Sequence, residues 1–324
     1  MVFLAGCALK GPKKIKVGFS MDTLKEERWQ KDRDLFIKRV EELGGEVVVQ
    51  VANSNDQLQN EQAENLLTLG VDVLVVVPHN GKTAAAIVES AHKSNTKVMA
   101  YDRIINDCDL DLYISFDNVK VGELQAEYLV KNVPKGNYVL IGGSPVDFNA
   151  ILFRKGQMNI LKPLIEKKDI NIIADQWARD WQPIEALKHT ENALTKSDNN
   201  INAVLTSNDG CAGGAVQALA EQKLAGKVAV TGQDADLAAC QRIIKGTQSM
   251  TVYKPIKELA YAAAEAAMAM AKNQSMAKAV NKINNGKIDV PSILLDPVSV
   301  DKSNLEETVI KNGYLKKEDV YGDI

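Results

Sequence analysis

Hydrophobic and polar positions follow two patterns that alternate along the chain. Short apolar runs, such as residues 71–77, are followed by longer segments in which apolar residues recur every three or four positions. A continuous apolar run is typical of a parallel strand buried on both faces, and the longer period is typical of an amphipathic helix. In residues 27–43, Trp29, Phe36 and Val40 fall on one helical face. This alternation predicts an α/β protein with doubly wound parallel sheets.

The alternation divides into two blocks of similar length. In the first block, we predict helices at 27–43, 57–69 and 80–94 and strands at 14–20, 46–51, 71–77, 97–101 and 112–116. In the second block, we predict helices at 119–132, 150–165, 183–194, 213–222 and 237–245 and strands at 138–141, 170–174, 201–206, 227–231 and 249–253. No low-complexity linker separates the blocks, so we expect short crossing strands rather than a flexible tether.

The last part of the chain adds elements that neither block needs. Residues 255–273 form an Ala-rich helix with Pro255 in its first turn, and the polar stretch 274–289 predicts a loop or a hairpin. A late strand at 290–295 precedes a polar, partly helical tail. An extra helix and strand after the second block predict that the chain returns to the first lobe before it ends.

Composition and charge exclude several classes of protein. The 324 residues carry a net charge of −3, without the basic excess that a general nucleic-acid binder shows. No run of 18 apolar residues is present, so we expect no membrane span. His79, His92 and His189 have no metal-ligand spacing with the cysteines, so no metal site is predicted. We interpret Cys108 and the other two internal cysteines, Cys211 and Cys240, as isolated thiols, although the sequence leaves a disulfide open.

The amino-terminal residues 1–13 contain a short motif of their own. Leu4-Ala5-Gly6-Cys7 resembles the lipobox in which bacterial lipoproteins carry a lipidated cysteine. A full signal peptide has a basic region and a longer apolar run before that site, and only six residues precede Cys7. Either the start is truncated or the match is chance. We favour lipid attachment at Cys7, with residues 10–14 as a polar tether.

Catalytic signatures are missing from the sequence. The chain has no G-x-S-x-G elbow, no phosphate-binding G-x-x-x-x-G-K-[ST] loop and no G-x-G-x-x-G after its first strand. No pair of carboxylates has the spacing of a general acid and base. We therefore expect a binding protein rather than an enzyme, with no cofactor.

Polar and aromatic residues recur where predicted strands end. Asp102 and Arg103 follow the strand at 97–101 and offer an acceptor beside a rigid donor fork. Read alone, this stretch favours a surface ion pair that closes a loop, since exposed pairs are common. In an open α/β sheet, however, ligands lie outside the carboxyl ends of strands, and the other strands end in the same way. The predicted site contains Arg28, Trp29, Asp102, Arg103, Asp147, Asn149, Arg154, Trp181, Asn208, Asp234 and Lys254.

These side chains suit a ligand with many hydroxyls. Every hydroxyl both donates and accepts hydrogen bonds, and the flat face of Trp181 could cover the apolar C–H side of a sugar. Trp29 also lies on the apolar stripe of its helix, so core packing is the alternative for that residue.

Several segments carry a family resemblance, namely 27–34, 100–103, 113–118, 142–147, 232–236 and 250–255. They resemble the periplasmic sugar-binding proteins of bacterial ABC transporters, and most of all the members that bind D-xylose. The likeness runs from about residue 14 to the carboxyl end. It implies two lobes joined by three crossing strands, the type I periplasmic binding protein fold. The lobes would comprise 14–115 with 254–290, and 116–253 with 291–324.

The resemblance also implies a function for the predicted site. The polar residues would hydrogen-bond the sugar, Trp29 and Trp181 would stack on it, and closure of the lobes would enclose it for a membrane permease and its ATPase. It implies an exported monomer in the periplasm or on the outer face of the cytoplasmic membrane. A sensor that signals to a chemoreceptor or a kinase, a sugar-modifying enzyme and a LacI-type regulator remain alternatives. The regulator would need a DNA-binding headpiece of about 50–60 residues ahead of the first strand. The first predicted strand begins at Lys14, so we do not expect a regulator.

Overall fold

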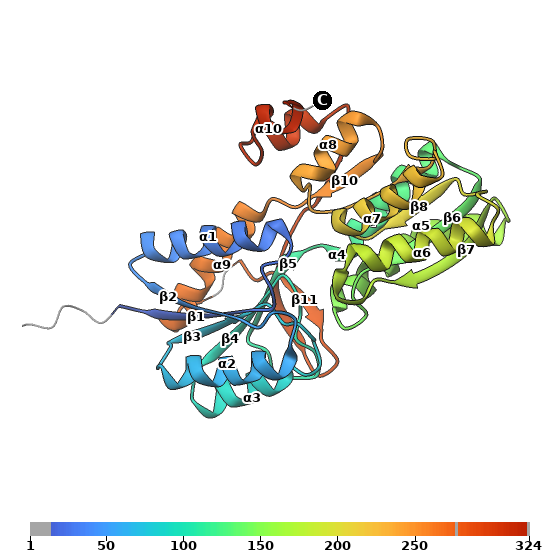
Figure 1. Cartoon of the computed structure of the whole chain (residues 1–324). Coiled ribbons are helices and arrows are strands. Elements are labelled where there is room, and N and C mark those ends of the chain that lie inside the picture. The colour runs from blue at the N-terminus through green and yellow to red at the C-terminus, as the bar shows by residue number, and fades with distance from the viewer. Residues whose placement is uncertain (1–13, 276–277, 323–324) are drawn as a thin grey trace, which may run out of the picture.

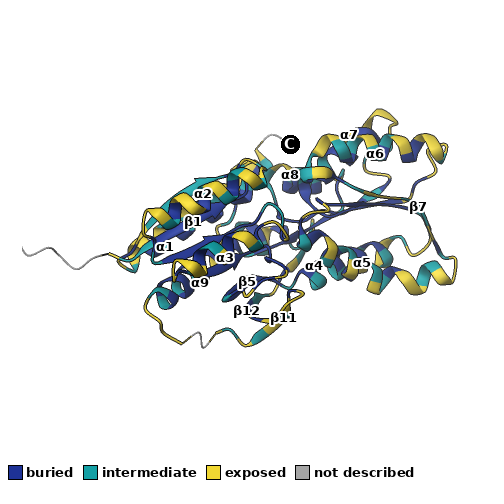
Figure 2. Cartoon of the chain, turned by 90° about the horizontal axis from the view of Figure 1, so that it is seen from below, coloured by how far each residue is buried: buried dark blue, intermediate teal, exposed yellow. Residues whose placement is uncertain are grey.

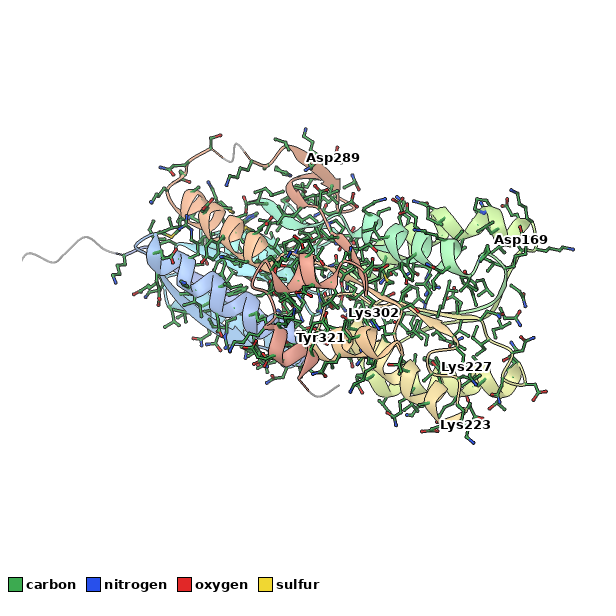
Figure 3. All side chains as sticks on the ribbon, turned by 90° about the horizontal axis from the view of Figure 1, so that it is seen from above. Asp169, Lys223, Lys227, Asp289, Lys302 and Tyr321 are labelled. Carbon is green, nitrogen blue, oxygen red and sulfur yellow. The ribbon has the colours of Figure 1, made fainter. Side chains whose placement is uncertain are left out.

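The computed structural model describes residues 14–275 and 278–322, which form two α/β lobes side by side (Figure 1). Within these residues, every helix is too short or too polar to cross a membrane. In each lobe a buried sheet lies between helices whose outer faces are exposed (Figure 2). Charged side chains such as Asp169 and Lys223 project from the outer end of the second lobe, away from the region between the lobes (Figure 3).

The first lobe is built on a seven-stranded sheet in the order β11-β12-β5-β4-β3-β1-β2. Its strands are β1 (Lys16–Met21), β2 (Glu46–Val51), β3 (Val73–Val76), β4 (Lys97–Tyr101), β5 (Leu112–Phe116), β11 (Asn281–Asn284) and β12 (Asp289–Leu295). All neighbours are parallel except β11 and β12, which form a hairpin. The prediction placed a loop or hairpin within 274–289, whereas β11 from that stretch pairs with the late strand. Its helices are α1 (Glu27–Glu42), α2 (Asp56–Thr68), α3 (Ala85–Lys93) and α9 (Ile256–Ala271).

Strand β3 shows why the apolar runs became parallel strands. Val73 and Val75 pack into the cluster formed with α1 and α9, whereas Leu74 and Val76 pack into the cluster formed with α2 and α3. All four side chains are fully buried. A strand with helices on both faces needs apolar residues at every position, so the sequence cannot alternate there.

The second lobe is built on a four-stranded parallel sheet in the order β7-β6-β8-β9. Its strands are β6 (Gly136–Gly142), β7 (Ile170–Trp177), β8 (Ala203–Thr206) and β9 (Ala229–Val230). One face packs on α4 (Asn118–Asn132) and α5 (Phe148–Glu166). The other packs on α6 (Pro183–Lys196) and α7 (Asp209–Glu221). The two largest boundary differences from the prediction are at helix starts. Helix α7 begins at Asp209 rather than 213, and α3 begins at Ala85 rather than 80.

Helices α4 and α5 approach at the level of their backbones. A Cβ atom on Gly122 would lie 2.0 Å from the carbonyl oxygen of Phe153, and one on Gly156 would lie 1.9 Å from that of Val119. Only glycine fits at both positions. The close crossing brings the first turn of α5 to the region between the lobes.

A small layer completes the second lobe near the crossings. Strand β10 (Met250–Tyr253) pairs antiparallel with β13 (Val298–Asp301), and α8 (Leu237–Lys245) and α10 (Lys317–Tyr321) pack beside them. A 3-10 turn, Arg179–Trp181, and a π-helical segment, Glu306–Ile310, complete the regular elements.

The chain passes between the lobes after β5, after β10 and between β12 and β13, as the predicted fold class requires. The predicted division at residue 290 lies inside β12, whose residues Ser292–Leu295 pair with β5. The third crossing therefore follows Leu295, because an apolar strand that pairs in a sheet cannot also be a connection.

Candidate functional site

A cavity lies between the two lobes, at the carboxyl ends of β1, β4, β6 and β8. The space between its walls, counted together with its opening to solvent, is about 320 Å³. The predicted residues that line it are Arg28, Trp29, Asp102, Arg103, Asp147, Asn149, Trp181, Asn208, Asp234 and Lys254. Glu26, Phe153 and Gln233 line it as well.

Arg28 lies in the first turn of α1 and contacts carboxylates from both lobes. Its Nη2 is 2.8 Å from Asp102 Oδ2, its Nη1 is 3.6 Å from Asp234 Oδ1, and its Nε donates to Asp32 one turn along the helix at 3.0 Å. Asp32 also accepts from the Tyr101 hydroxyl. Burial alone would lower the pKa of Arg28, but these carboxylates raise it well above its ordinary value. The guanidinium is therefore a fixed, permanently charged donor.

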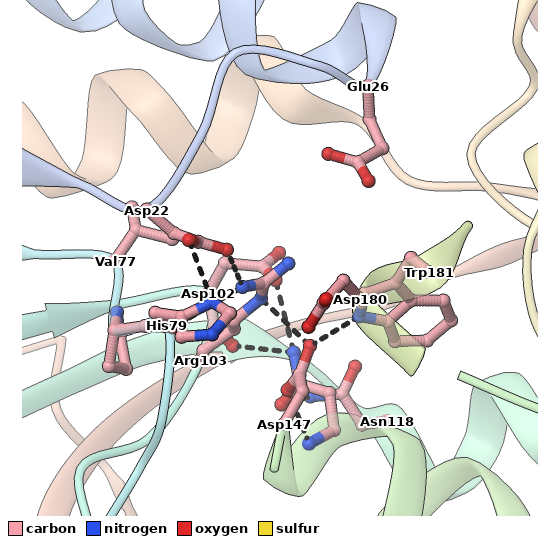
Figure 4. A network of polar contacts seen from close by, with 12 residues as sticks. Asp22, Glu26, Val77, His79, Asp102, Arg103, Asn118, Asp147, Asp180 and Trp181 are labelled. Atoms are coloured by element: carbon pink, nitrogen blue, oxygen red, sulfur yellow. Dashed lines mark hydrogen bonds and ion pairs between the residues drawn. The ribbon is translucent and has the colours of Figure 1, made fainter. Parts of the chain in front are cut away.

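Arg103 is held in the same way from the first lobe (Figure 4). Its Nη1 is 2.6 Å from Asp22 Oδ2 and its Nε is 2.8 Å from Asp147 Oδ2, in the other lobe. His79 Nδ1 lies 2.9 Å from the second oxygen of Asp22. Burial would raise the pKa of Asp22, but the His79 hydrogen bond and the Arg103 charge lower it below its usual value.

The backbone of Asp102 adopts an uncommon conformation, with φ at 62°. Its carbonyl oxygen accepts from the Tyr113 hydroxyl at 3.0 Å, the Ser115 hydroxyl at 2.6 Å and Asn149 Nδ2 at 3.0 Å. These three hydrogen bonds hold a backbone conformation that a non-glycine residue rarely adopts. The turn sets both Asp102 and Arg103 against the cavity.

Lys254 follows β10 at the second crossing between the lobes. Its Nζ lies 3.1 Å from Asp234 Oδ1 and 3.8 Å from Asp102 Oδ2. Burial would raise the pKa of Asp102, but the charges of Arg28 and Lys254 outweigh burial and lower it. The carboxylate of Asp102 is therefore ionised and is an acceptor only.

Two helix starts supply polar groups from the second lobe. Asp147 caps α5 by accepting from the Asn149 backbone N–H at 2.9 Å, and its other oxygen accepts from Trp181 Nε1 at 3.1 Å. Asn208 caps α7 by accepting from the Cys211 N–H at 2.9 Å. Capping immobilises each side chain, so the cavity wall is arranged before any ligand enters.

The tryptophans form the apolar part of the wall. The Trp29 ring lies 4.3 Å from the guanidinium carbon of Arg28 and 5.2 Å from that of Arg103, and its other side packs in the first-lobe core. Trp29 is therefore both a core residue and a site residue. Trp181 stands against Gly143, where a Cβ atom would lie 2.0 Å from its ring.

The structure does not bring Arg154 to the cavity. Its guanidinium pairs with Asp175 and lies 5.2 Å from the Trp177 ring. Its neighbour Phe153 lines the cavity instead. Successive residues on a helix point about 100° apart, so only one of the two can face the cavity. The recurrence of polar residues after strand ends does not show which side of the following helix faces the cavity.

Three cavity residues were missed by the sequence analysis. Gln233 precedes Asp234 on the same loop, so the strand-end rule could have included it. Phe153 is visible only once the phase of α5 is known. Glu26 lies directly before α1 and could have been found from its proximity to Arg28.

The remaining predictions concern cysteines and metals. Cys108, Cys211 and Cys240 are free thiols, as predicted, and all three are buried. Over residues 14–275 and 278–322, the His, Cys, Asp and Glu side chains form no group that could hold a metal ion. Cys7 lies outside the described residues.

Comparison with known proteins agrees with this geometry. Residues 17–275 match the family model described as a periplasmic binding protein domain. The chain belongs to this family. It is 54% identical to the D-xylose-binding periplasmic protein of Haemophilus influenzae and 55% identical to that of Escherichia coli, in each case over 95% of this chain and 93% of the relative. These relatives are binding proteins rather than enzymes.

A solved structure shares the whole architecture. The carbohydrate transporter solute-binding protein of Chloroflexus aurantiacus, in complex with D-glucose, superposes with a TM-score of 0.89 at 31% identity, covering 95% of this chain and 98% of that one. The predicted fold class and the predicted family are thereby confirmed.

Proposed function

We propose that this protein binds D-xylose between its lobes and delivers it to an ABC-type importer. The observation that carries the proposal is the enclosed cavity in which Arg28, Arg103 and Lys254 face Asp102, Asp147 and Asp234. Relatives named for D-xylose binding are more than half identical over almost the entire chain, which supports this sugar over others.

The chemistry of the wall fits a neutral sugar. Each hydroxyl can donate to a carboxylate and accept from a guanidinium or an ammonium, and a hydrogen bond to a charged group contributes about 1.5–3 kcal/mol. Trp181 offers a flat apolar face beside these groups. A pocket shaped for a pentose would reject a hexose through its extra hydroxymethyl group, an effect of about 1–3 kcal/mol.

Delivery would depend on movement of the lobes. The cavity residues Arg28, Asp102 and Lys254 are at most 2% exposed, so the structure is closed. A sugar would enter when the lobes rotate apart about the three crossings, and binding would favour the closed form. A membrane permease and its ATPase would recognise that form. A chemoreceptor or sensor kinase would use the same binding chemistry, and pull-down of membrane partners separates the two.

Calorimetric titration tests the proposal directly. D-xylose should bind as one sugar per monomer and more tightly than D-glucose, D-ribose or L-arabinose. The sugar should be recovered unchanged after long incubation. Preference for another of these sugars would contradict the assignment of D-xylose, and a chemically altered sugar would contradict a binding function.

Attachment through Cys7 belongs to the same proposal. A protein held outside the cytoplasmic membrane by a lipid would remain near its permease. Expression from the natural gene in a bacterium that processes lipoproteins should give a diacylglyceryl mass on Cys7 and a membrane-bound product. A Cys7→Ala variant should be released, and an unmodified Cys7 in the wild type would contradict the lipid anchor.

A further inference from the structure

Glu26 differs from the other acidic residues of the cavity. Asp102, Asp147 and Asp234 each face a cationic side chain of the cavity wall within 3.1 Å. Glu26 instead has one oxygen 3.1 Å from its neighbour Lys25, which lies outside the cavity wall. Within the described part of the chain, neither carboxylate oxygen of Glu26 accepts a hydrogen bond, although both atoms are buried.

The Glu26 side chain points into the space where a ligand would lie. Glu26 lines the cavity, and Figure 4 shows its oxygens pointing from the start of α1 into the space beside Asp180 and Trp181. A buried carboxylate that accepts no hydrogen bond is unfavourable even with one ammonium group nearby, so such a group in a binding cavity calls for a donor from the ligand.

We propose that Glu26 is a specificity residue that accepts a hydrogen bond from one hydroxyl of the bound sugar and excludes sugar acids. The inference rests on the proposed sugar-binding function and assigns the class of ligand more narrowly. A neutral sugar supplies the missing donor. A sugar carboxylate near the same position would meet a like charge in a buried site, where repulsion is weakly screened.

The neighbouring residue provides the competing explanation. Lys25 Nζ donates to the Asp180 carbonyl oxygen of the other lobe at 2.5 Å. In this alternative, Glu26 does not contact the sugar, and its role is to hold Lys25 in place across the mouth of the cavity. In that case its removal would weaken all sugars equally, and removal of Lys25 would have the same effect.

The experiment compares Glu26→Gln with wild-type protein by calorimetry, using D-xylose and analogues that each lack one hydroxyl. Glu26→Gln should weaken D-xylose about tenfold, since the amide keeps the shape but loses the charge. Wild type and Glu26→Gln should bind one analogue with equal affinity, namely the analogue that lacks the hydroxyl contacting Glu26. The ratio of D-glucuronate to D-xylose affinity should rise at least tenfold in Glu26→Gln.

Two further variants make the result decisive. Glu41→Gln, an exposed change on the same helix, should leave every affinity unchanged. Lys25→Ala should weaken all analogues by one common factor. An equal loss for every analogue in Glu26→Gln, or no loss for any, would overturn the inference while leaving D-xylose binding intact. Wild-type protein that bound no sugar would overturn the proposed function and the inference together.

Discussion

Buried charges dominate the cavity at the scale of single residues. Arg28 and Asp102 are each at most 2% exposed, and each has an oppositely charged partner within 3 Å. Burying such a group is costly unless it is paired, and loss of one partner leaves the other uncompensated. The wall is therefore a set of mutually dependent charges rather than independent contacts.

Asp102→Ala tests that dependence. The change leaves Arg28 and Lys254 with one fewer counter-charge, so affinity for D-xylose should fall by about 2–5 kcal/mol, or roughly 30-fold or more. Calorimetric titration measures the loss. Asp109→Ala is the matched control, because Asp109 pairs with Lys287 at 2.7 Å on the surface. Unchanged affinity in Asp102→Ala would remove Asp102 from the site.

Gly143→Ala tests the position of Trp181. The new methyl group would lie 2.0 Å from the ring, so the indole must move and lose its hydrogen bond to Asp147. Sugar affinity should fall at least tenfold, with a changed tryptophan emission spectrum. Gly213→Ala on α7 is the control, because its nearest neighbour is the flexible end of Arg242 at 3.3 Å. A normal emission spectrum in Gly143→Ala would show that the ring has room.

His79 should make stability depend on pH. Its hydrogen bond to Asp22 raises the pKa of His79 above the ordinary value of 6.5. The folded protein then binds more protons than the unfolded chain, so this stabilisation is complete below about pH 6.5 and is lost as pH rises through the raised pKa. The difference in melting temperature between wild type and His79→Gln should shrink from about pH 6 to about pH 8. A constant difference would contradict the assignment.

The start of α1 is the element that connects the lobes most directly. Lys25 donates to the Asp180 carbonyl, and Arg28 lies 3.6 Å from Asp234. Between them, Glu27 Oε2 accepts from the Leu237 N–H at 3.2 Å, at the first residue of α8. A carboxylate is favourable at a helix N-terminus, which adds to this contact. One short segment therefore bridges both sides of the cavity when the lobes close.

Glu27→Ala should shorten the life of the closed form. The partly exposed contact contributes roughly 0.2–1 kcal/mol, so the dissociation rate of D-xylose should rise about 1.4- to 5-fold in stopped-flow measurements. Glu27 does not line the cavity, so the order of sugar preference should not change. Glu306→Ala, which breaks a surface pair with Lys317 at 2.6 Å, is the control. An altered sugar preference would mean that Glu27 acts on the ligand itself.

At the scale of the whole molecule, we expect the two lobes to move as a hinged pair. Their sheets are separate, and three crossings join them. Addition of D-xylose should reduce the radius of gyration in small-angle X-ray scattering. At a hundredfold excess over the dissociation constant it should stabilise the protein by about 2.7 kcal/mol. At that concentration Asp102→Ala should be stabilised by less than about 1 kcal/mol and should compact less than the wild type. A constant radius in the wild type would contradict hinge closure.

Much of the architecture could be predicted because its causes are local. The strand Val73–Val76 is apolar at every position, which indicates burial on both of its faces. The buried positions of α4, among them Gly122, recur with the 3.6-residue period of a helix. Strand β12 was divided wrongly because pairing with β5 depends on residues almost two hundred positions away. Nothing in residues 290–295 marks where a strand leaves its sheet.

The sequence by itself determined the alternation of strands and helices and the kinds of side chain at the strand ends, because both depend on near neighbours in the chain. The tertiary structure decided which of those side chains meet. Phe153 faces the cavity and Arg154 does not, because the packing of α4 against α5 sets the rotation of α5. Glu26 is a site residue because residues of the second lobe, such as Trp181, line the same cavity. Proximity between lobes is a property of the folded chain, which no local pattern encodes.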